Sequence, residues 1–233
     1  MINPTIERYP ELISLAVHEF RTPASVVGGY LRMLQRDTDA PLTERQRKMV
    51  DEAEKSAARL VALFSELSDI GKMDAGIITT DSKPLELGAL LDDVARHVHK
   101  PEDRGVELQL RSNDSGTKMN ISGDAARLRS AFDAVFRCIL REHAGPTTIV
   151  GERRRTDLDG RRSAVIVVAE ESAVEEAYNL PHDPFDEKRG GMGLALPLAR
   201  RVFEQHGGRL LAPARGDDRV RRSSAIVVLP ITE

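Results

Sequence analysis

The sequence predicts an α+β fold: an N-terminal helical hairpin that forms a four-helix bundle on dimerisation, followed by an α/β sandwich. The chain has 233 residues, enough for two modest domains at about 150 residues per domain. Near residue 75 the apolar pattern changes from two long helical stripes to alternating short strands and helices. Elements that alternate in this way favour a layered sandwich. We therefore expect two domains, residues 1–75 and 76–233.

The first helix is predicted over Glu11–Arg36. Its apolar residues recur three and four positions apart and share one stripe: Leu12, Ile13, Ala16, Phe20, Val27, Leu31 and Leu34. Polar residues and Pro41 then interrupt the pattern. Thr43 and Gln46 have the spacing of a capping box, which predicts the start of a second helix.

The second helix has a nearly heptad apolar stripe, and Gly71 is expected to end it. The stripe consists of Met49, Val50, Ala53, Ala57, Leu60, Phe64, Leu67 and Ile70. Two helices expose more apolar surface than they can cover for each other, and a second copy of the chain is the simplest cover. The hairpin therefore predicts a homodimer.

From Gly76 onward the chain is expected to alternate between strands and helices. The expected strands are Ile77–Asp81, Val106–Arg111, Lys118–Ile121, Thr147–Arg155, Arg162–Glu170, Arg209–Ala212 and Ser224–Leu229. The expected helices are Leu85–Val98, Asp124–Glu142 and Leu194–Gln205. Asp159 with Gly160 marks a hairpin between the two longest strands. The order predicts a mixed sheet with helices on one face.

The composition argues against several classes of function. Lys and Arg number 34 against 37 Asp and Glu, so the net charge is −3 and lacks the basic excess of a nucleic-acid-binding protein. No apolar run approaches the ~20 residues that cross a bilayer, and no signal peptide is visible at Met1. The single cysteine, Cys138, suits a reducing cytosol. We expect a cytoplasmic protein with no metal site, whose segment here contacts neither nucleic acid nor membrane.

One hexapeptide of the first helix, His-Glu-Phe-Arg-Thr-Pro, contains the candidate catalytic residues. His18 lies about 200° around the helix from Phe20, so it faces away from the apolar stripe and towards solvent. Arg21 and Thr22 follow three and four residues later and share its surface, beside Glu19. A neutral imidazole is a nucleophile, a carboxylate can hold its other ring N–H, and a hydroxyl can orient water.

This hexapeptide, on the first helix of a hairpin of this length, resembles the phosphoacceptor box of sensor histidine kinases. The resemblance implies a dimerisation and histidine-phosphotransfer domain over residues 1–75 and a degenerate histidine-kinase-type ATPase-like domain over residues 76–233. It implies that His18 carries a phosphoryl group on a ring nitrogen, that Glu19 is its acid/base and orienting partner, and that Thr22 positions water for phosphatase activity. The implied partner is a response-regulator receiver domain, docked on the bundle below His18.

A glycine-rich segment resembles the glycine box of the family's ATPase domain. It spans Gly190–Leu196 and opens a helix that ends at His206–Gly208. Its Gly191 and Gly193 would let backbone N–H groups approach a phosphate. Glu170 stands where the family has its adenine-site aspartate. These three residues are the candidate nucleotide contacts.

Three parts of the family's nucleotide pattern are altered. Ala134 and Cys138 stand where the family has two asparagines, and neither is an oxygen ligand for magnesium. Ser172 and Val174 replace the adenine-loop glycines, and Ala195 replaces the last glycine of the phosphate box. These losses argue against efficient use of Mg–ATP. No cofactor is certain, and ATP and Mg²⁺ stay open as candidates with incomplete motifs.

Two further features are expected to be less specific. The segment Glu171–Gly190, where the nucleotide lid would lie, is short and acidic, and Pro181, Pro184 and Phe185 are candidate remnants of the lid. Clusters of arginine at Arg153–Arg155, Arg161–Arg162 and Arg221–Arg222 are interleaved with aspartates. They predict solvated sheet edges, which are candidates for protein docking.

Three functional hypotheses follow. In the first, His18 exchanges a phosphoryl group with a receiver aspartate in a phosphorelay, and the ATPase-like domain is a docking module. In the second, the chain is a working kinase core that autophosphorylates His18 from ATP, which the residual glycine box favours. In the third, the chain is a non-catalytic pseudokinase scaffold, a reading that leaves the intact hexapeptide unexplained.

Overall fold

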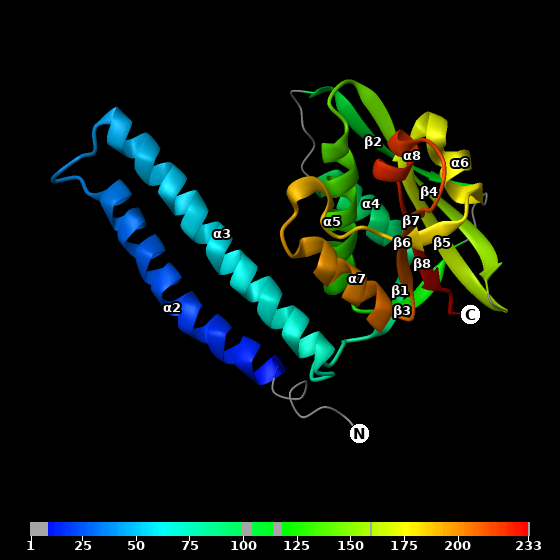
Figure 1. Cartoon of the computed structure of the whole chain (residues 1–233), viewed down its shortest axis with the longest axis horizontal. Helices are drawn as coiled ribbons and strands as arrows, with labels where there is room; N and C mark the ends of the chain where they lie inside the picture. The colour runs from blue at the N-terminus through cyan, green and yellow to red at the C-terminus, as the bar shows by residue number, and fades with distance from the viewer. Residues whose placement is uncertain (1–8, 99–103, 114–117, 159, 233) are drawn as a thin grey trace. The chain divides into compact units, whose positions relative to one another are not determined.

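The computed structural model describes residues 9–98, 104–113, 118–158 and 160–232 (Figure 1). Its contacts divide the chain into two compact units, Met1–Ile78 and Thr79–Glu233. The first unit contains a pair of long helices, and the second contains a mixed β-sheet with helices (Figure 1). The predicted α+β class, a helical hairpin followed by an α/β unit, is confirmed.

The hairpin consists of α2 (Tyr9–Arg36) and α3 (Glu44–Asp74). The capping box forms as predicted, because the Thr43 hydroxyl accepts from the backbone of Gln46 while the Gln46 side chain accepts from the backbone N–H of Thr43 at 3.0 Å. Between the helices the rings of Phe20 and Phe64 stack with centroids 5.7 Å apart. The helix α2 therefore presents a fixed face to α3, and its other faces carry exposed side chains.

The predicted end of α3 at Gly71 is wrong. Gly71 lies inside the helix and is buried against Ile13, whose Cγ2 atom would be 3.3 Å from an added Cβ. The helix instead ends at a Schellman motif around Gly76, which has φ +67°. The N–H of Gly76 donates to Met73 O at 3.0 Å, and the N–H of Ile77 donates to Lys72 O at 3.0 Å. Gly71 thus allows α2 and α3 to pack closely, and Gly76 adopts the positive φ that the turn after α3 requires.

The main sheet of the second unit has six strands in the order β2-β4-β5-β8-β7-β6. β2 pairs with β4 in parallel, and the other neighbours are antiparallel, so the sheet is mixed as predicted. Its strands are β2 (Val106–Ser112), β4 (Thr147–Leu158), β5 (Arg161–Glu170), β6 (His182–Pro184), β7 (Arg209–Pro213) and β8 (Ala225–Pro230). The β4–β5 hairpin forms as predicted with Gly160 at φ +73°, and Asp159 lies outside the described residues.

The helices of the second unit are mostly where the pattern predicts them, but the sheet is covered on both faces, not on one (Figure 1). One face packs against helices α4 (Leu87–His97), α5 (Ala125–Glu142) and α7 (Ala195–Gln205). There Phe132 of α5 meets Phe203 of α7 edge to face, with centroids 5.0 Å apart. The other face packs against α6 (Val174–Asn179) and α8 (Asp218–Arg222).

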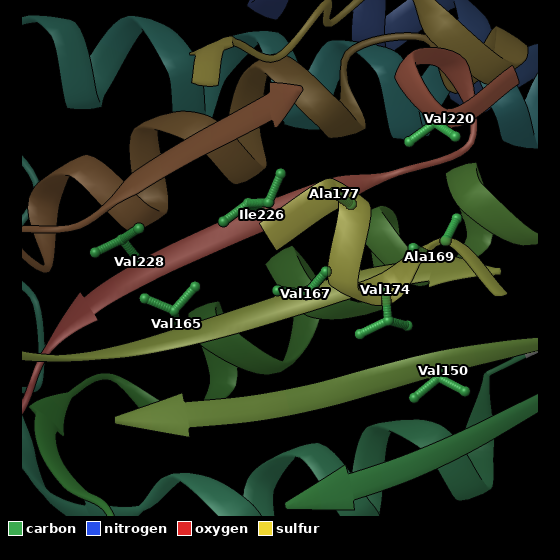
Figure 2. Close-up of a cluster of buried hydrophobic side chains, with 10 residues drawn as sticks. Val150, Val165, Val167, Ala169, Val174, Ala177, Val220, Ile226 and Val228 are labelled. Carbon is green, nitrogen blue, oxygen red and sulfur yellow. The ribbon is translucent and has the colours of Figure 1, made fainter. Parts of the chain in front are cut away.

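A second hydrophobic core explains why this other face is covered. In β5, Val165, Val167 and Ala169 alternate with residues of the first face and pack against Val174 and Ala177 of α6 (Figure 2). The strand is apolar on both faces, which is typical of a strand buried between two layers. The sequence carried this signal, because seven consecutive residues of Arg161–Glu170 are uncharged, and the structure buries all seven.

Arg154 of β4 links α6 to the sheet. The Arg154 side chain is largely buried, and its guanidinium binds the carboxylate of Glu175 and that of Glu152, the latter at 2.6 Å. It also lies 4.2 Å from the centroid of the Tyr178 ring. The Arg154 guanidinium holds the pKa of Glu175 below its usual range. The first two members of the Arg153–Arg155 cluster are therefore partly or fully buried, and only Arg155 fits the predicted solvated edge.

Two short strands lie later in the chain than the predicted strands Ile77–Asp81 and Lys118–Ile121. The expected strand Ile77–Asp81 does not form, and β1 lies at Lys83–Glu86, where it pairs with β3 (Asn120–Gly123) in a separate two-stranded sheet. The helix expected from Leu85 begins at Leu87, because the Glu86 carboxylate caps it by accepting from the N–H of Gly88 at 2.8 Å. Cap chemistry and strand pairing, rather than apolar spacing, set these boundaries.

Candidate functional site

The predicted phosphoacceptor lies on the exposed face of α2. The His18 side chain is 79% exposed and its Nδ1 atom lies 3.2 Å from Glu19 Oε1, with the Glu19 side chain 67% exposed. A carboxylate oxygen can only accept, so this contact selects the tautomer that carries its proton on Nδ1. The lone pair of Nε2 then faces solvent, as an attacking nitrogen must.

Two further residues of the hexapeptide lie beside the histidine. The Thr22 hydroxyl donates to the backbone carbonyl of His18 at 3.3 Å and keeps its lone pairs available as acceptors. Helix α2 continues through Pro23, whose missing N–H leaves the carbonyl of Glu19 without its usual helical donor. The structure thus brings His18, Glu19 and Thr22 to one face within a single helical turn.

Sequence reasoning did not identify the contact that orients Arg21. Its Nη2 atom donates to the Ser65 hydroxyl of α3 at 3.0 Å, and Ser65 in turn donates to Val61 O at 3.1 Å. The signal was present only as a polar residue, Ser65, between Phe64 and Leu67 of the apolar stripe. The pairing of two positions 44 residues apart requires the helix register, which sequence spacing alone does not give.

The candidate nucleotide contacts fall into two groups. Gly191 and Gly193 have φ of +57° and +65°, so the glycine box keeps backbone conformations that favour glycine. Glu170 ends β5 and is only partly exposed. Beyond it the chain departs from the implied adenine loop, because Val174 points into the second hydrophobic core (Figure 2).

The residues at the implied magnesium position do not fit that ion. Ala134 and Cys138 are buried in α5, and neither carries an oxygen that could bind a hard cation. Arg137 on the same helix forms an ion pair with Asp133 at 2.8 Å. Within the described residues, no group of three His, Cys, Asp or Glu side chains is gathered as a metal site.

Burial should make Cys138 unreactive in the folded chain. Desolvation raises the pKa of its thiol to about 12, whereas an unfolded thiol has a pKa of about 8.5. At about pH 8.5 iodoacetamide should modify Cys138 only in denaturant, as read by intact mass. The unfolded state loses its proton first, so stability should fall as the pH rises from about 8.5 towards 12. Rapid alkylation of the native chain would contradict this assignment.

The segment expected to form the nucleotide lid packs against the rest of the second unit. After α6 it adds β6 to the sheet edge, and Phe185 is then buried. The Arg189 guanidinium lies 4.9 Å from the Phe185 ring centroid and donates to Arg221 O at 2.6 Å. Arg200 of α7 binds the carboxylate of Glu187. These contacts hold the segment against the sheet edge and against α7.

Comparisons with known proteins find similar sequences and similar folds. Residues 11–76 match the model of the His Kinase A (phospho-acceptor) domain. The chain is 27% identical over 208 residues to the signal transduction histidine-protein kinase BarA of Escherichia coli strain K12, covering 85% of this chain and 22% of BarA. The chain thus spans about a fifth of that relative's length. No helix among residues 9–98, 104–113, 118–158 and 160–232 has both the length and the apolar character needed to cross a membrane.

Two solved structures share the fold. Full-length ShkA, in complex with AMPPNP, matches with a TM-score of 0.70 at 20% identity, over 96% of this chain and 46% of that chain. The histidine kinase ThkA, in complex with the response regulator protein TrrA, matches with a TM-score of 0.57 at 15% identity, over 98% of this chain and 63% of that chain. Residues 11–76 thus form a His Kinase A (phospho-acceptor) domain, and the chain as a whole is similar in sequence to histidine kinases and shares the fold of solved ones.

Proposed function

We propose that this chain passes a phosphoryl group between His18 and an aspartate of a response-regulator receiver domain. The observation that carries the proposal is the pair formed by His18 and Glu19, with Nδ1 3.2 Å from the carboxylate and the side chain 79% exposed. An exposed face is needed because the incoming aspartyl phosphate belongs to another protein. The solved complex of ThkA with TrrA supports a receiver as the kind of partner.

The transfer needs no other reactant. Nε2 of neutral His18 attacks the phosphorus of the aspartyl phosphate, the N–P bond forms, and the P–O bond to the carboxylate breaks with its electron pair left on the aspartate. The Nδ1 proton stays on the ring, where Glu19 accepts its hydrogen bond and stabilises the positive charge that develops on the imidazole. The reverse reaction returns the phosphoryl group to the receiver.

We place phosphatase activity on the same helical turn. For hydrolysis of a docked aspartyl phosphate, the Thr22 hydroxyl and the Glu19 carboxylate would orient and deprotonate a water molecule. Thr22 is 3.3 Å from the carbonyl of His18, so its oxygen is held on the face that a docked receiver would meet. Loss of the hydroxyl in Thr22→Val should therefore slow hydrolysis more than phosphoryl transfer.

We further propose that a separate kinase charges this relay. Support comes from buried Ala134 and Cys138 at the implied magnesium position and from Val174, which lies in a hydrophobic core instead of an adenine loop. In this form the second unit acts as a docking module and neither ATP nor Mg²⁺ is a cofactor.

The proposal is tested by transfer from a receiver domain phosphorylated with acetyl phosphate, using a panel of receivers and intact-mass detection. The wild-type chain should gain one phosphoryl group, and His18→Gln should gain none. His97→Gln, at an exposed histidine of the second unit, is the matched control and should behave as wild type. Equal labelling of the His18→Gln chain would refute the assignment.

The second candidate is a working kinase core that labels His18 from ATP. The positive φ angles of Gly191 and Gly193 favour it, because they keep a phosphate-approach loop in shape. Incubation with radiolabelled ATP and magnesium separates the two proposals. Label on the wild type that is absent from His18→Gln would establish the kinase. A scaffold alone would take no phosphoryl group from either ATP or a receiver.

We also propose that the hairpin dimerises into a four-helix bundle. Phe20, Val27 and Leu34 are exposed apolar residues at heptad spacing beside the seam with α3. Burying a glutamate there would be costly, so Val27→Glu should convert a dimer to monomers in sedimentation analysis. Val26→Glu, one residue away and 51% exposed, points about 100° further around the helix and should leave the dimer intact. Dissociation of both variants would contradict the assigned stripe.

A further inference from the structure

One hydrogen bond joins α2 to α3 beside the phosphoacceptor, and the proposed phosphotransfer gives it no role. Arg21 follows His18 by three residues, so their Cβ atoms are about 5–6 Å apart on one side of α2. From this position the Arg21 Nη2 atom donates to the Ser65 hydroxyl of α3 at 3.0 Å. A serine of the second helix thus orients the guanidinium of an arginine next to the exposed histidine.

The Ser65 hydroxyl is itself held in place. It is partly buried and donates its proton to Val61 O, one turn earlier in α3, at 3.1 Å. Because a hydroxyl has a single proton, Ser65 can only accept from Arg21. Beside this pair the rings of Phe20 and Phe64 stack, with centroids 5.7 Å apart. Aromatic packing therefore sets the register of the two helices at this level, and the Ser65 hydroxyl adds the orientation of one side chain.

A guanidinium that is held at one donor can still bind an anion. An arginine carries five N–H donors, and the bond to Ser65 uses one of them. The planar fork of a guanidinium matches the paired oxygens of a phosphoryl group. A long side chain loses rotamer freedom when it binds an anion, and an anchor that has already ordered the side chain reduces that loss. The bond to Ser65 therefore prepares Arg21 for an anion at His18.

We propose that Arg21 binds the oxygens of the phosphoryl group carried by His18, and that Ser65 is the positioning residue that holds Arg21 for this task. The inference rests on the proposed phosphoryl transfer and adds two residues to it. Arg21 forms and breaks no covalent bond, and its positive charge offsets the negative charge of the phosphoryl group while that group moves between the aspartate and Nε2. Ser65 acts through Arg21 and touches neither the phosphoryl group nor the imidazole.

Phosphorus NMR tests the contact on the full chain after chemical phosphorylation with phosphoramidate. The resonance of phosphorylated His18 is the one that is missing from His18→Gln. A cation within about 4–6 Å favours the ionised form of an anion, so the wild-type phosphoryl group should ionise at a pH about one unit lower than that of Arg21→Gln. Arg36→Gln, at an exposed arginine about 27 Å further along α2, is the matched control and should titrate as wild type.

The same titration tests Ser65. The midpoint of Ser65→Ala should lie between those of wild type and Arg21→Gln, because its arginine is present but not oriented. Ser65→Thr keeps a hydroxyl at the same place and should restore the wild-type midpoint. The matched control is Ser56→Ala, because Ser56 is an exposed serine of α3 that donates to Glu52 O at 2.9 Å. This control removes the same kind of bond within the helix and should leave the midpoint unchanged.

The rate of single-turnover transfer from a phosphorylated receiver gives a second measurement. Arg21→Gln should transfer about tenfold to 100-fold more slowly than wild type, the usual effect of losing a hydrogen bond to a charged group. Ser65→Ala should be about threefold to tenfold slower, as for a neutral hydrogen bond. If Ser65 acts through Arg21, adding Ser65→Ala to Arg21→Gln should slow transfer no further.

Three outcomes would overturn the proposal. A wild-type titration midpoint in Arg21→Gln would show that the guanidinium does not reach the phosphoryl group. A wild-type midpoint in Ser65→Ala would show that Arg21 needs no positioning residue. Variants that unfold at lower urea concentrations but titrate as wild type would show that the contact only joins α2 to α3.

Failure of the proposed function gives a different result. A wild-type chain that takes no phosphoryl group from any receiver would refute the phosphotransfer. The titration of the chemically phosphorylated chain would still decide whether Arg21 binds a phosphoryl group on His18.

Discussion

Glu19→Ala should slow phosphoryl transfer to His18 by about 10²- to 10⁴-fold, the usual contribution of a positioned acid/base group. The Glu19 carboxylate accepts a hydrogen bond from His18 Nδ1, with Oε1 3.2 Å from that nitrogen, so its loss removes both the tautomer preference and a negative charge beside the ring. The rate is measured by single-turnover transfer from a phosphorylated receiver. Circular dichroism should be unchanged, because the Glu19 side chain is largely exposed.

Two variants make this result specific. Glu19→Gln keeps an oxygen that can accept a hydrogen bond from Nδ1–H but removes the charge, so its rate should lie between those of wild type and alanine. Glu44→Ala is the matched control, because it removes an exposed carboxylate from the first turn of α3. Among the ion pairs of the described residues, Glu44 pairs with Lys48 alone, at 3.2 Å. This variant should transfer the phosphoryl group at the wild-type rate. A Glu19→Ala chain with the wild-type rate would show that His18 works without a carboxylate partner.

Gly208→Ala should destabilise the second unit by at least about 3 kcal/mol. A Cβ atom at this position would lie 2.2 Å from the carbonyl oxygen of Val228, which belongs to the backbone of β8 and cannot rotate away. The N–H of Gly208 also donates to Phe203 O at 2.8 Å, closing the end of α7. The methyl group would therefore force β7, β8 and the helix end apart.

Urea unfolding followed by circular dichroism measures this loss as a fall in the midpoint concentration. Gly145→Ala is the matched control, because an added Cβ would meet nothing within 4 Å there, and its stability should stay within about 0.5 kcal/mol of wild type. A Gly208→Ala chain as stable as Gly145→Ala would mean that β7 and β8 can separate at little cost.

Local signals in the sequence were enough to predict most of the fold. The capping box of Thr43, the hairpin at Gly160 and the periodicity of α5 each depend on residues close in the chain, and all three form. The elements that were missed depend on distant partners. β6 exists because it pairs with β7, and α6 exists because Val174 and Ala177 cover the second face of β5. Neither short segment has a periodic pattern long enough to detect.

The candidate site divides in the same way. His18, Glu19 and Thr22 lie within one helical turn, so helix geometry alone predicts their juxtaposition. The contact between Arg21 and Ser65 depends on the register of two helices. Whether the residues after Glu170 form a loop or a helix depends on the sheet face that Val174 covers. The residues of the segment alone do not specify that face.

The short strand β6 has a consequence for solubility. Sheet edges can recruit strands from other molecules and seed aggregation, and short, proline-containing or charged edge strands resist this. β6 has only three residues, and its Pro184 offers no N–H to an incoming strand. At the opposite edge, β2 exposes Glu107 and Arg111. Both edges of the sheet thus carry features that disfavour pairing with a strand of another molecule.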